Sequence, residues 1–265
     1  MLPAFISPLL LTPPIEMIIL KSKQEIKLIE KACRIAAEAL EMLAGLIRPG
    51  IKTKELEEYA EAFIKAKGAF PAFKGYRGFP ASICVSINNQ VVHGIPSQRV
   101  IEEGDIVSID LGVLYEGYYG DAARTYAAGK IGELQRKLLE VAERALYIGI
   151  EKARAGNRIG DISAAIQSYV ESNGFSVVRN FVGHGVGKFL HEEPQVPNFG
   201  KPGKGPRLKE GMTIAIEPMV NTGSPDVMVL DDGWTVVTAD GGYSAHFEHT
   251  VAITKNGAEI LTKLN

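Results

Sequence analysis

The sequence predicts an α+β fold built from two similar halves. Stretches with apolar residues at alternating three- and four-residue spacing, typical of amphipathic helices, precede short stretches of alternating apolar and polar residues, typical of strands. This order occurs twice, because RPGIKTKELEEYAEAFIKAKG, ending at Gly68, aligns with RAGNRIGDISAAIQSYVESNG, ending at Gly174. Each half is too thin to bury its own apolar face, so we expect both to pack about a pseudo-twofold axis as one domain.

The first half is expected to begin with a long helix. Ser22, followed three residues later by Glu25, forms a capping box, and apolar residues then recur until Pro49. Cys33 falls among these apolar residues, which indicates a buried core thiol.

The remaining elements follow the same periodicities. A second helix is predicted over residues 53–67, with Tyr59 among its inward-facing residues, and a strand over residues 82–88. The second half repeats the order, with helices over 133–155 and 159–173 and strands after them.

Residues 106–126, IVSIDLGVLYEGYYGDAARTY, are predicted to form a hairpin that carries two acids. A turn centred between Tyr115 and Glu116 would place Asp110 directly opposite Asp121, with their Cβ atoms ~5 Å apart. Two such charges destabilise a strand pair unless a cation lies between them or one is protonated. The hairpin therefore predicts a metal site or a catalytic dyad.

Three further residues extend this cluster. Asp110 and Glu217 have the same separation as Gly104 and Gly211, so the second half brings its own acid to the matching strand position. Glu248 is expected inside a strand of similar design, and His184 lies in a glycine-rich stretch that leaves room around its ring. Two divalent ions would balance the four carboxylates, and oxygen-rich ligation with one imidazole suits Mn, Fe or Co at least as well as Zn.

The composition excludes several other classes. The chain has 265 residues, 46% hydrophobic and 23% charged, with a net charge of −2 and no dense Lys/Arg run, so no nucleic-acid partner is expected. Two cysteines give no disulfide framework, and we expect a cytoplasmic protein. Residues 1–16 are apolar but rich in proline, which argues against a membrane span or a secretory signal. We expect residues 1–21 to be a non-essential extension, with Met17 as an alternative start.

The cluster resembles that of a known family. Asp110, Asp121, His184, Glu217 and Glu248 match in order and spacing the five ligands of the dinuclear methionine aminopeptidases, and the stretch from Gly183 to Asn198 is similar to their signature. The resemblance extends from about Ser22 to the C-terminus. It implies the pita-bread fold, a curved antiparallel sheet, with residues 22–265 as one catalytic domain and pseudo-repeats at about 22–130 and 131–265.

The resemblance also implies an activity and a role for each ligand. The family removes the initiator methionine of nascent chains when the second residue is small. In it, the position of Asp110 chelates one metal, those of Asp121 and Glu248 bridge both, and those of His184 and Glu217 complete the other site. A bridging water is thereby activated for attack.

Other residues match by the same resemblance. Glu217 would assist proton transfer, and His93 and His191 match the family's histidines beside the leaving nitrogen and the carbonyl oxygen. His246 and His249 flank Glu248, and we assign them supporting or structural roles only. The methionine pocket would be lined by Tyr76, Phe79, Cys84 and Trp234, with Phe73 and Leu190 at pocket positions that vary in the family.

Three alternatives are weighed against this hypothesis. Proline-specific peptidases of the same fold have a large extra N-terminal domain, whereas only about 20 residues precede the first helix here. Only a short segment separates His184 from Glu217, so the helical insertion of the type II enzymes is missing, which favours the bacterial-like type I. Non-enzymatic binding proteins of this fold lose metal ligands, and all five ligands are present here.

The expected partners are nascent chains that begin with Met, and the ribosome is an open option. We expect the protein to be a monomer.

Overall fold

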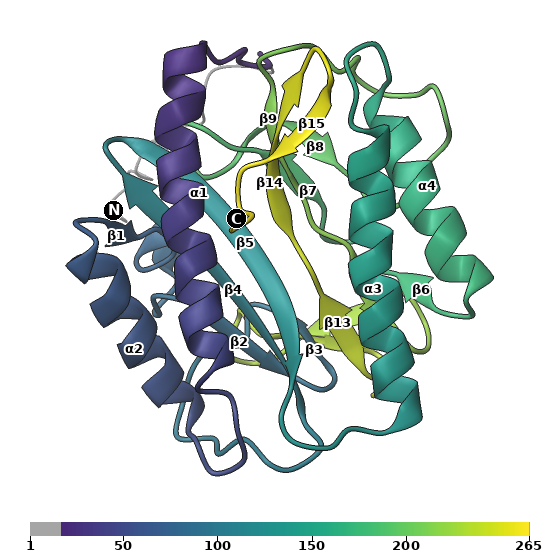
Figure 1. The fold of residues 1–265 in the computed structure, drawn as a ribbon. Coiled ribbons are helices and arrows are strands. Elements are labelled where there is room, and N and C mark those ends of the chain that lie inside the picture. Colours follow the sequence, from purple (N-terminus) through teal and green to yellow (C-terminus); the bar gives the residue numbers. More distant parts are fainter. Residues whose placement is uncertain (1–16, 265) are drawn as a thin grey trace, which may run out of the picture.

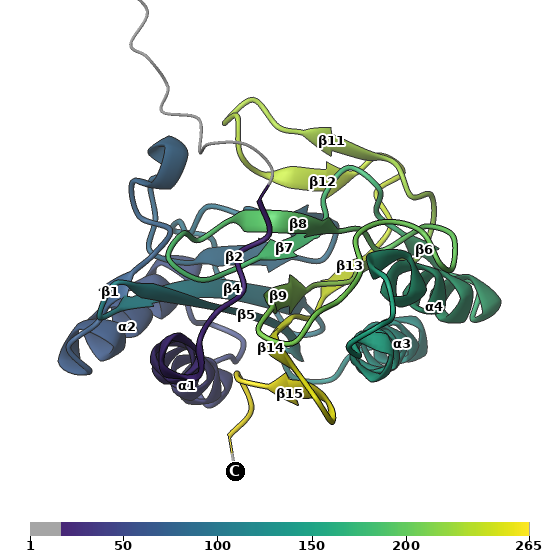
Figure 2. The ribbon, with the colours of Figure 1, turned by 90° about the horizontal axis from the view of Figure 1, so that it is seen from above.

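The helices lie on one side of a set of antiparallel strands (Figure 1, Figure 2). The computed structural model describes residues 17–264, so the prediction for residues 1–16 lies outside the described part. Within it, the helices are α1 (Lys23–Ala44), α2 (Thr53–Ala66), α3 (Glu133–Lys152), α4 (Ile159–Ser172) and a short 3-10 turn, η1 (Tyr76–Gly78). Figure 1 shows α1 and α2 over one half and α3 and α4 over the other, as the repeat predicts.

The strands form four small antiparallel sheets. Their bounds are β1 (Phe70–Pro71), β2 (Cys84–Ile87), β3 (Gln90–Val92), β4 (Ile106–Tyr115), β5 (Tyr118–Ala127), β6 (Ser176–Val177), β7 (Gly183–Gly185), β8 (Glu192–Val196), β9 (Thr213–Ile216), β10 (Met219–Asn221), β11 (Val227–Val229), β12 (Val236–Thr238), β13 (Ser244–His246), β14 (His249–Thr254) and β15 (Gly257–Ile260). Their orders are β1-β4-β2 with β5 beside β4, β15-β14-β9-β7-β8, β13-β10-β6 and β11-β12-β3.

The helix starts follow the sequence signals. Ser22 Oγ accepts from the Glu25 N–H at 3.3 Å, and Glu25 Oε2 accepts from the Ser22 N–H at 2.9 Å, which completes the predicted capping box. The expected inward position of Tyr59 is wrong, since 51% of this residue is exposed. Glu57 takes the inward place on α2, because its buried carboxylate accepts from the Ser82 N–H at 2.9 Å.

The two halves repeat the same hydrogen bonds. The Gly50 N–H donates to Ile101 O at 2.9 Å, and the Gly156 N–H donates to Leu208 O at 2.9 Å. Both glycines have positive φ, 95° and 98°, a conformation that other residues rarely adopt. The internal similarity of the sequence therefore corresponds to a repeated turn ahead of α2 and α4.

Each half has its own apolar core. One cluster is drawn from residues 32–128 and lies under α1 and α2, and the other is drawn mainly from residues 138–253 and lies under α3 and α4. Cys33 is fully buried in a smaller cluster with Ile29 and Leu261, as the apolar pattern predicts. With both cores under the helices, the opposite side of the strands remains available for polar groups.

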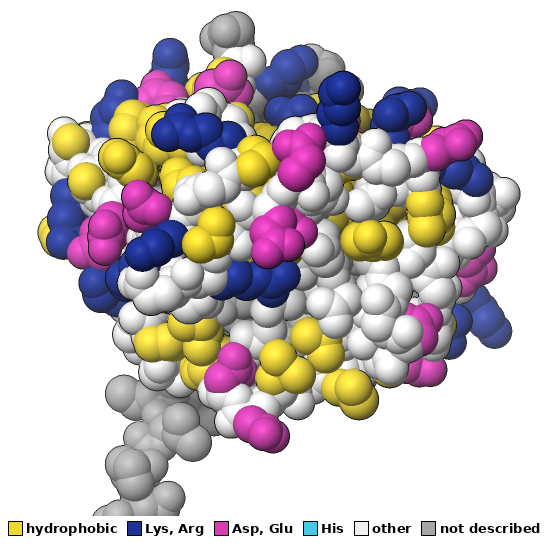
Figure 3. Space-filling view, turned by 90° about the horizontal axis from the view of Figure 1, so that it is seen from below, with side chains coloured by type: hydrophobic (Ala, Val, Ile, Leu, Met, Phe, Trp, Pro, Cys, Tyr) yellow, Lys and Arg dark blue, Asp and Glu magenta, His cyan; other side chains and the backbone are white. Residues whose placement is uncertain are grey.

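Charges of both signs are mixed on one face of the protein. On the face seen in Figure 3, Lys and Arg side chains are interspersed with Asp and Glu. None of the helices within residues 17–264 is both long and apolar enough to cross a membrane. Lys21, at the end of the predicted extension, is itself buried and pairs with Glu192 at 2.6 Å.

Candidate metal centre

The β4–β5 hairpin brings the two acids of the first half to one face. Asp110 pairs with Ala123 and Asp121 pairs with Gly112, so the predicted direct opposition of the two acids is wrong. They are diagonal neighbours, for which a spacing of ~7–8 Å is typical. The register differs by two residues, an even number, so both carboxylates keep the same face.

The turn explains the difference in register. Tyr115 pairs with Tyr118, which leaves Glu116 and Gly117 as a two-residue turn with φ of 48° and 82°. Turns of this kind follow the twist of the strands and need positive φ at both positions. Gly117 therefore lies in the turn itself.

The acids of the second half lie at breaks between strands, and the expectation that they lie inside strands is wrong. Glu217 follows β9 and precedes Pro218, and Glu248 lies between β13 and β14. At Glu217 the chain passes from the five-stranded sheet to the three-stranded sheet β13-β10-β6, and at Glu248 it passes back. Pro218 has no N–H to continue the hydrogen bonds between strands, so the strand pairing stops next to Glu217.

His184 reaches the acids from β7. A Cβ on the neighbouring Gly183 would lie 2.4 Å from Ala215 O, so only glycine allows this close packing. His184 Nδ1 lies 2.9 Å from Gly185 O, and because a carbonyl only accepts, Nδ1 carries the proton. The lone pair of Nε2 is then free, 3.8 Å from Asp121 Oδ2 and 3.5 Å from Glu217 Oε1.

Two threonines join the halves behind the acids. Thr250 Oγ1 donates to Asp121 O at 2.8 Å and accepts from its N–H at 3.3 Å. Thr125 Oγ1 donates to His246 O at 2.8 Å and accepts from its N–H at 2.9 Å. Between these pairs, the Glu248 N–H donates to the carbonyl of β5 residue 123 at 2.8 Å. The hydroxyls thus continue an antiparallel pairing of β5 with the β13–β14 segment, and fix Asp121 and Glu248 relative to each other.

Thr250→Val is expected to weaken metal binding by about tenfold. The change keeps the shape but leaves the buried Asp121 N–H and C=O without their partner, a cost of about 1–3 kcal/mol. Calorimetric metal titration measures the effect, and Thr250→Ser should restore it. Thr254→Val, which removes a hydroxyl that donates to Gly257 O at 2.9 Å and accepts from the Asn256 N–H at 3.2 Å, is the control. Equal affinity in Thr250→Val and the control would contradict the positioning role.

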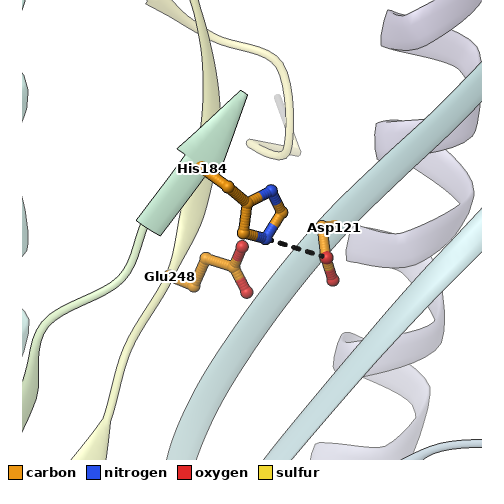
Figure 4. Close-up of side chains that lie close together, drawn as sticks. All are labelled: Asp121, His184 and Glu248. Atoms are coloured by element: carbon orange, nitrogen blue, oxygen red, sulfur yellow. Dashed lines mark ion pairs between the residues drawn. The ribbon is translucent and has the colours of Figure 1, made fainter. Parts of the chain in front are cut away.

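The residues fit a cation-binding site. Figure 4 shows Asp121, His184 and Glu248 directed toward one another, and one ligand atom from each lies within 4.8 Å of the others. One oxygen each of Asp110, Asp121 and Glu248 is buried and has no hydrogen-bond partner within residues 17–264. Burial, and then the neighbouring carboxylates, raise the pKa of all three acids well above ordinary values. Divalent cations would satisfy both the orphan oxygens and the repulsion.

A single cavity of about 160 Å³ contains all the predicted site residues. Its lining includes the five predicted ligands, His93 and His191, and all six predicted pocket residues, together with Arg77. A second cavity, of about 260 Å³, lies on the helix side and shares only Glu248 with them. The first cavity therefore joins an acidic end to an apolar end.

Comparison with known proteins identifies the family. The model of metallopeptidase family M24 matches residues 27–255. The chain belongs to this family. A methionine aminopeptidase of Clostridium perfringens is 59% identical over 93% of this chain and 99% of its own. The crystal structure of methionine aminopeptidase from Thermotoga maritima has a TM-score of 0.93 at 49% identity, covering 94% of this chain and all of that one.

The comparisons also bear on the proline-specific alternative. Prolidase from Pyrococcus furiosus is also similar, with a TM-score of 0.77 at 31% identity, but the match covers only 66% of its chain. The predictions of the pita-bread fold, of a metallopeptidase and of a relative of the methionine aminopeptidases are confirmed. The roles of individual residues remain predictions.

The two predicted catalytic histidines of this M24 protein contact different side chains of the cavity. His93 has a positive φ of 59° and packs edge-on against Trp234, with ring centroids 6.3 Å apart. Burial lowers the pKa of His93 below its ordinary value. His191 Nδ1 lies 2.9 Å from Tyr76 Oη, and its ring centroid is 4.2 Å from that of His184. Desolvation also lowers the pKa of His191, which favours neutral rings at both positions.

The two histidines that flank Glu248 have different surroundings. His246 is buried, with Nε2 3.5 Å from Glu217 Oε2. His249 instead faces the helix side, where Nδ1 lies 2.8 Å from Thr262 Oγ1. The assignment to supporting roles fits both, but only His246 can orient a predicted ligand.

Sequence patterns missed three residues of this M24 site. Thr125 and Thr250 act across the two halves, and nothing in their local sequence distinguishes them from other strand threonines. Arg77 lines the cavity beside Tyr76, and its position between Gly75 and Gly78 was the only available signal.

Proposed function

We propose that this protein removes the N-terminal methionine from nascent polypeptides whose second residue is small. The observation that carries the proposal is the single cavity in which four carboxylates and His184 face an apolar end. A free amino terminus and a scissile peptide bond would lie at the acidic end, with the methionine side chain at the apolar end. The family membership and the methionine aminopeptidase relatives support the same reaction.

The acidic end would hold two divalent ions. Five side chains would hold them, namely those of Asp110, Asp121, His184, Glu217 and Glu248. When bound, the ions supply a Lewis acid for the carbonyl and lower the pKa of a water to near neutral. Manganese, iron, cobalt and zinc all remain candidates, since the ligand set has no thiolate that would select among them.

The protein's own groups would move the protons and orient the substrate. Glu217, half-buried with both oxygens near histidines, would accept a proton from the attacking water and pass it to the leaving amine. His93 would bind beside the leaving nitrogen, and His191, held by Tyr76, would donate to the carbonyl oxygen. Neutral imidazoles suit both tasks.

The apolar end would select methionine. Phe79 meets Trp234 edge-on with ring centroids 5.1 Å apart and Phe73 edge-on at 6.5 Å, and edges of this kind suit a thioether. Leu190 is fully buried beside them. Burial raises the pKa of the Cys84 thiol well above its ordinary value, so this group stays neutral and behaves as an apolar wall.

The remaining proposals concern the setting of the enzyme. Residues 22–265 would act as one catalytic domain, because both halves supply ligands to the same site. We propose a monomer that works in the cytoplasm on chains emerging from the ribosome. Ribosome pull-down and analytical ultracentrifugation test these points separately.

Hydrolysis of Met-Ala-Ser tests the reaction. The purified protein, loaded anaerobically in parallel with Mn, Fe, Co or Zn, should release methionine from this peptide with at least one metal. It should leave Met-Leu-Ser largely intact, since a bulky second residue clashes at the metals. Tight metal binding without release of methionine under any of these conditions would favour a binding protein of the same fold.

Trp234→Ala is expected to lower the preference for methionine by about tenfold. The change removes one aromatic wall, and contacts of this size discriminate side chains by about 1–3 kcal/mol. The ratio of kcat/KM for Met-Ala-Ser to that for Leu-Ala-Ser measures the preference, with metal content determined in the same samples. Trp234→Phe should retain most of it, and an unchanged ratio in the alanine variant would count against the pocket.

A further inference from the structure

Arg77 is the only Lys or Arg that lines the active-site cavity within residues 17–264. Most of the lining is buried or half-buried, and only Arg77 and His191 are exposed. These two residues therefore mark the open side of the cavity. A peptide that inserts its first residue into the closed apolar end must leave through this side.

The loop around Arg77 holds the side chain at the opening. Arg77 has φ 50° and ψ 21°, a left-handed conformation unusual for a residue with a Cβ. The Gly75 N–H donates to Phe79 O at 2.8 Å and the Phe79 N–H donates to Tyr76 O at 2.9 Å, so the loop is closed by its own backbone. The guanidinium carbon lies 5.5 Å from the centroid of the Tyr76 ring, which itself borders the site.

The guanidinium has no acidic partner in the protein. No Asp or Glu of the described chain lies within 4.0 Å of it. Lys74, in the same loop, is by contrast paired with Glu61 at 2.8 Å. Arg77 is thus a fixed and unpaired cation at the exit of the cavity.

We propose that Arg77 forms a subsite for a carboxylate on the substrate downstream of the scissile bond, an inference that rests on the proposed function. With the methionine at the apolar end and the first peptide bond at the acids, each further residue of an extended chain advances ~3.4 Å toward the opening. The third or fourth residue then passes Arg77. The planar guanidinium fork suits a carboxylate, either an Asp or Glu side chain or the terminal carboxylate of a short peptide.

The charge balance of the site favours the same ligand. Two divalent ions would neutralise the four carboxylates, which leaves Arg77 as the uncompensated charge of the lining. Acidic residues at the third position should therefore be favoured and basic ones disfavoured. Because the residue is exposed, the preference should be about threefold to fivefold and should decrease with salt.

The test compares peptides that differ only in charge. The metal-loaded enzyme is assayed for kcat/KM at low and high salt with Met-Ala-Asp-amide, Met-Ala-Asn-amide and Met-Ala-Lys-amide, and with Met-Ala-Ser bearing a free or an amidated C-terminus. The first set reports on side-chain carboxylates and the second on the terminal carboxylate. The variants are Arg77→Gln, Arg77→Lys and Arg77→Glu. Arg48→Gln, an exposed arginine away from the cavity, is the matched control.

We expect wild type and the Arg48→Gln control to prefer the aspartate peptide at low salt. Arg77→Gln should cleave the asparagine peptide normally but lose the preference, Arg77→Lys should retain part of it, and Arg77→Glu should reverse it. A wild-type ratio of one, or a ratio unchanged in Arg77→Gln, overturns the assignment of Arg77 while the proposed function stands. Failure of wild type to cleave any of these peptides would instead overturn the proposed function, and this inference with it.

Discussion

Glu217→Gln is expected to lower kcat/KM for Met-Ala-Ser by about 10³-fold without unfolding the protein. The amide has nearly the same shape but no longer accepts a proton from the attacking water, and positioned general bases contribute about 10²–10⁴-fold. Its remaining oxygen can still face His184 or His246, which lie within 3.5 Å of the carboxylate in the native site. KM should therefore change much less than kcat.

Two comparisons separate this role from simple loss of the site. Glu259→Gln makes the same chemical change at an exposed strand position and should retain full activity. His184→Ala should abolish turnover through loss of metal, which metal analysis would detect. If Glu217→Gln binds two metal ions, gives a native circular-dichroism spectrum and still hydrolyses the peptide at the wild-type rate, the assignment of Glu217 as proton carrier is wrong.

Local periodicity was sufficient to place the acids on the correct face. Asp110 and Asp121 fall on one side of a hairpin because strand side chains alternate, and this held although the predicted turn was misplaced. The alignment of the two halves also matches Gly50 with Gly156, and both lie in equivalent turns because positive φ restricts the residue types there. Features that depend on one strand or one turn can thus be predicted from the sequence.

Features that depend on two distant segments could not be predicted from the sequence. Glu217 and Glu248 lie at breaks because neighbouring strands change sheets together, and that change is a property of the pairing rather than of either segment. The bonds of Thr125 to His246 and of Thr250 to Asp121 join residues from opposite halves of the chain. Only the assembled fold shows that these hydroxyls set the distance between the two predicted bridging ligands.

Removal of the metal ions is expected to destabilise the protein, and more so at pH 8 than at pH 5. In the metal-free fold, burial and mutual repulsion raise the pKa of Asp110, Asp121 and Glu248 above the ordinary value of about 4. For groups with raised pKa, the contribution to stability is fully present below the unfolded pKa and is lost as the pH rises through the folded pKa. The chelated protein should therefore lose stability from about pH 4 upward.

The loaded protein should show the opposite trend. Its ligands are already ionised and paired with cations, and metal affinity rises with pH because protons no longer compete for the oxygens. At a free metal concentration of about 100 times Kd, metal binding should raise the free energy of unfolding by about 2.7 kcal/mol, which corresponds to about 5–10 °C in Tm. Scanning calorimetry with and without chelator at both pH values measures the difference.

A variant separates charge repulsion from general loss of packing. Asp110→Asn keeps the volume of the side chain but removes one of the buried charges, so it should raise the Tm of the chelated protein at pH 8 and reduce the gain on adding metal. The matched change Asp231→Asn, at an exposed loop position, should leave both values as in wild type. Four converging acids without cations must either repel one another or remain protonated. If the Tm of the wild-type protein at pH 8 is the same with chelator as with metal, cations do not hold these carboxylates together.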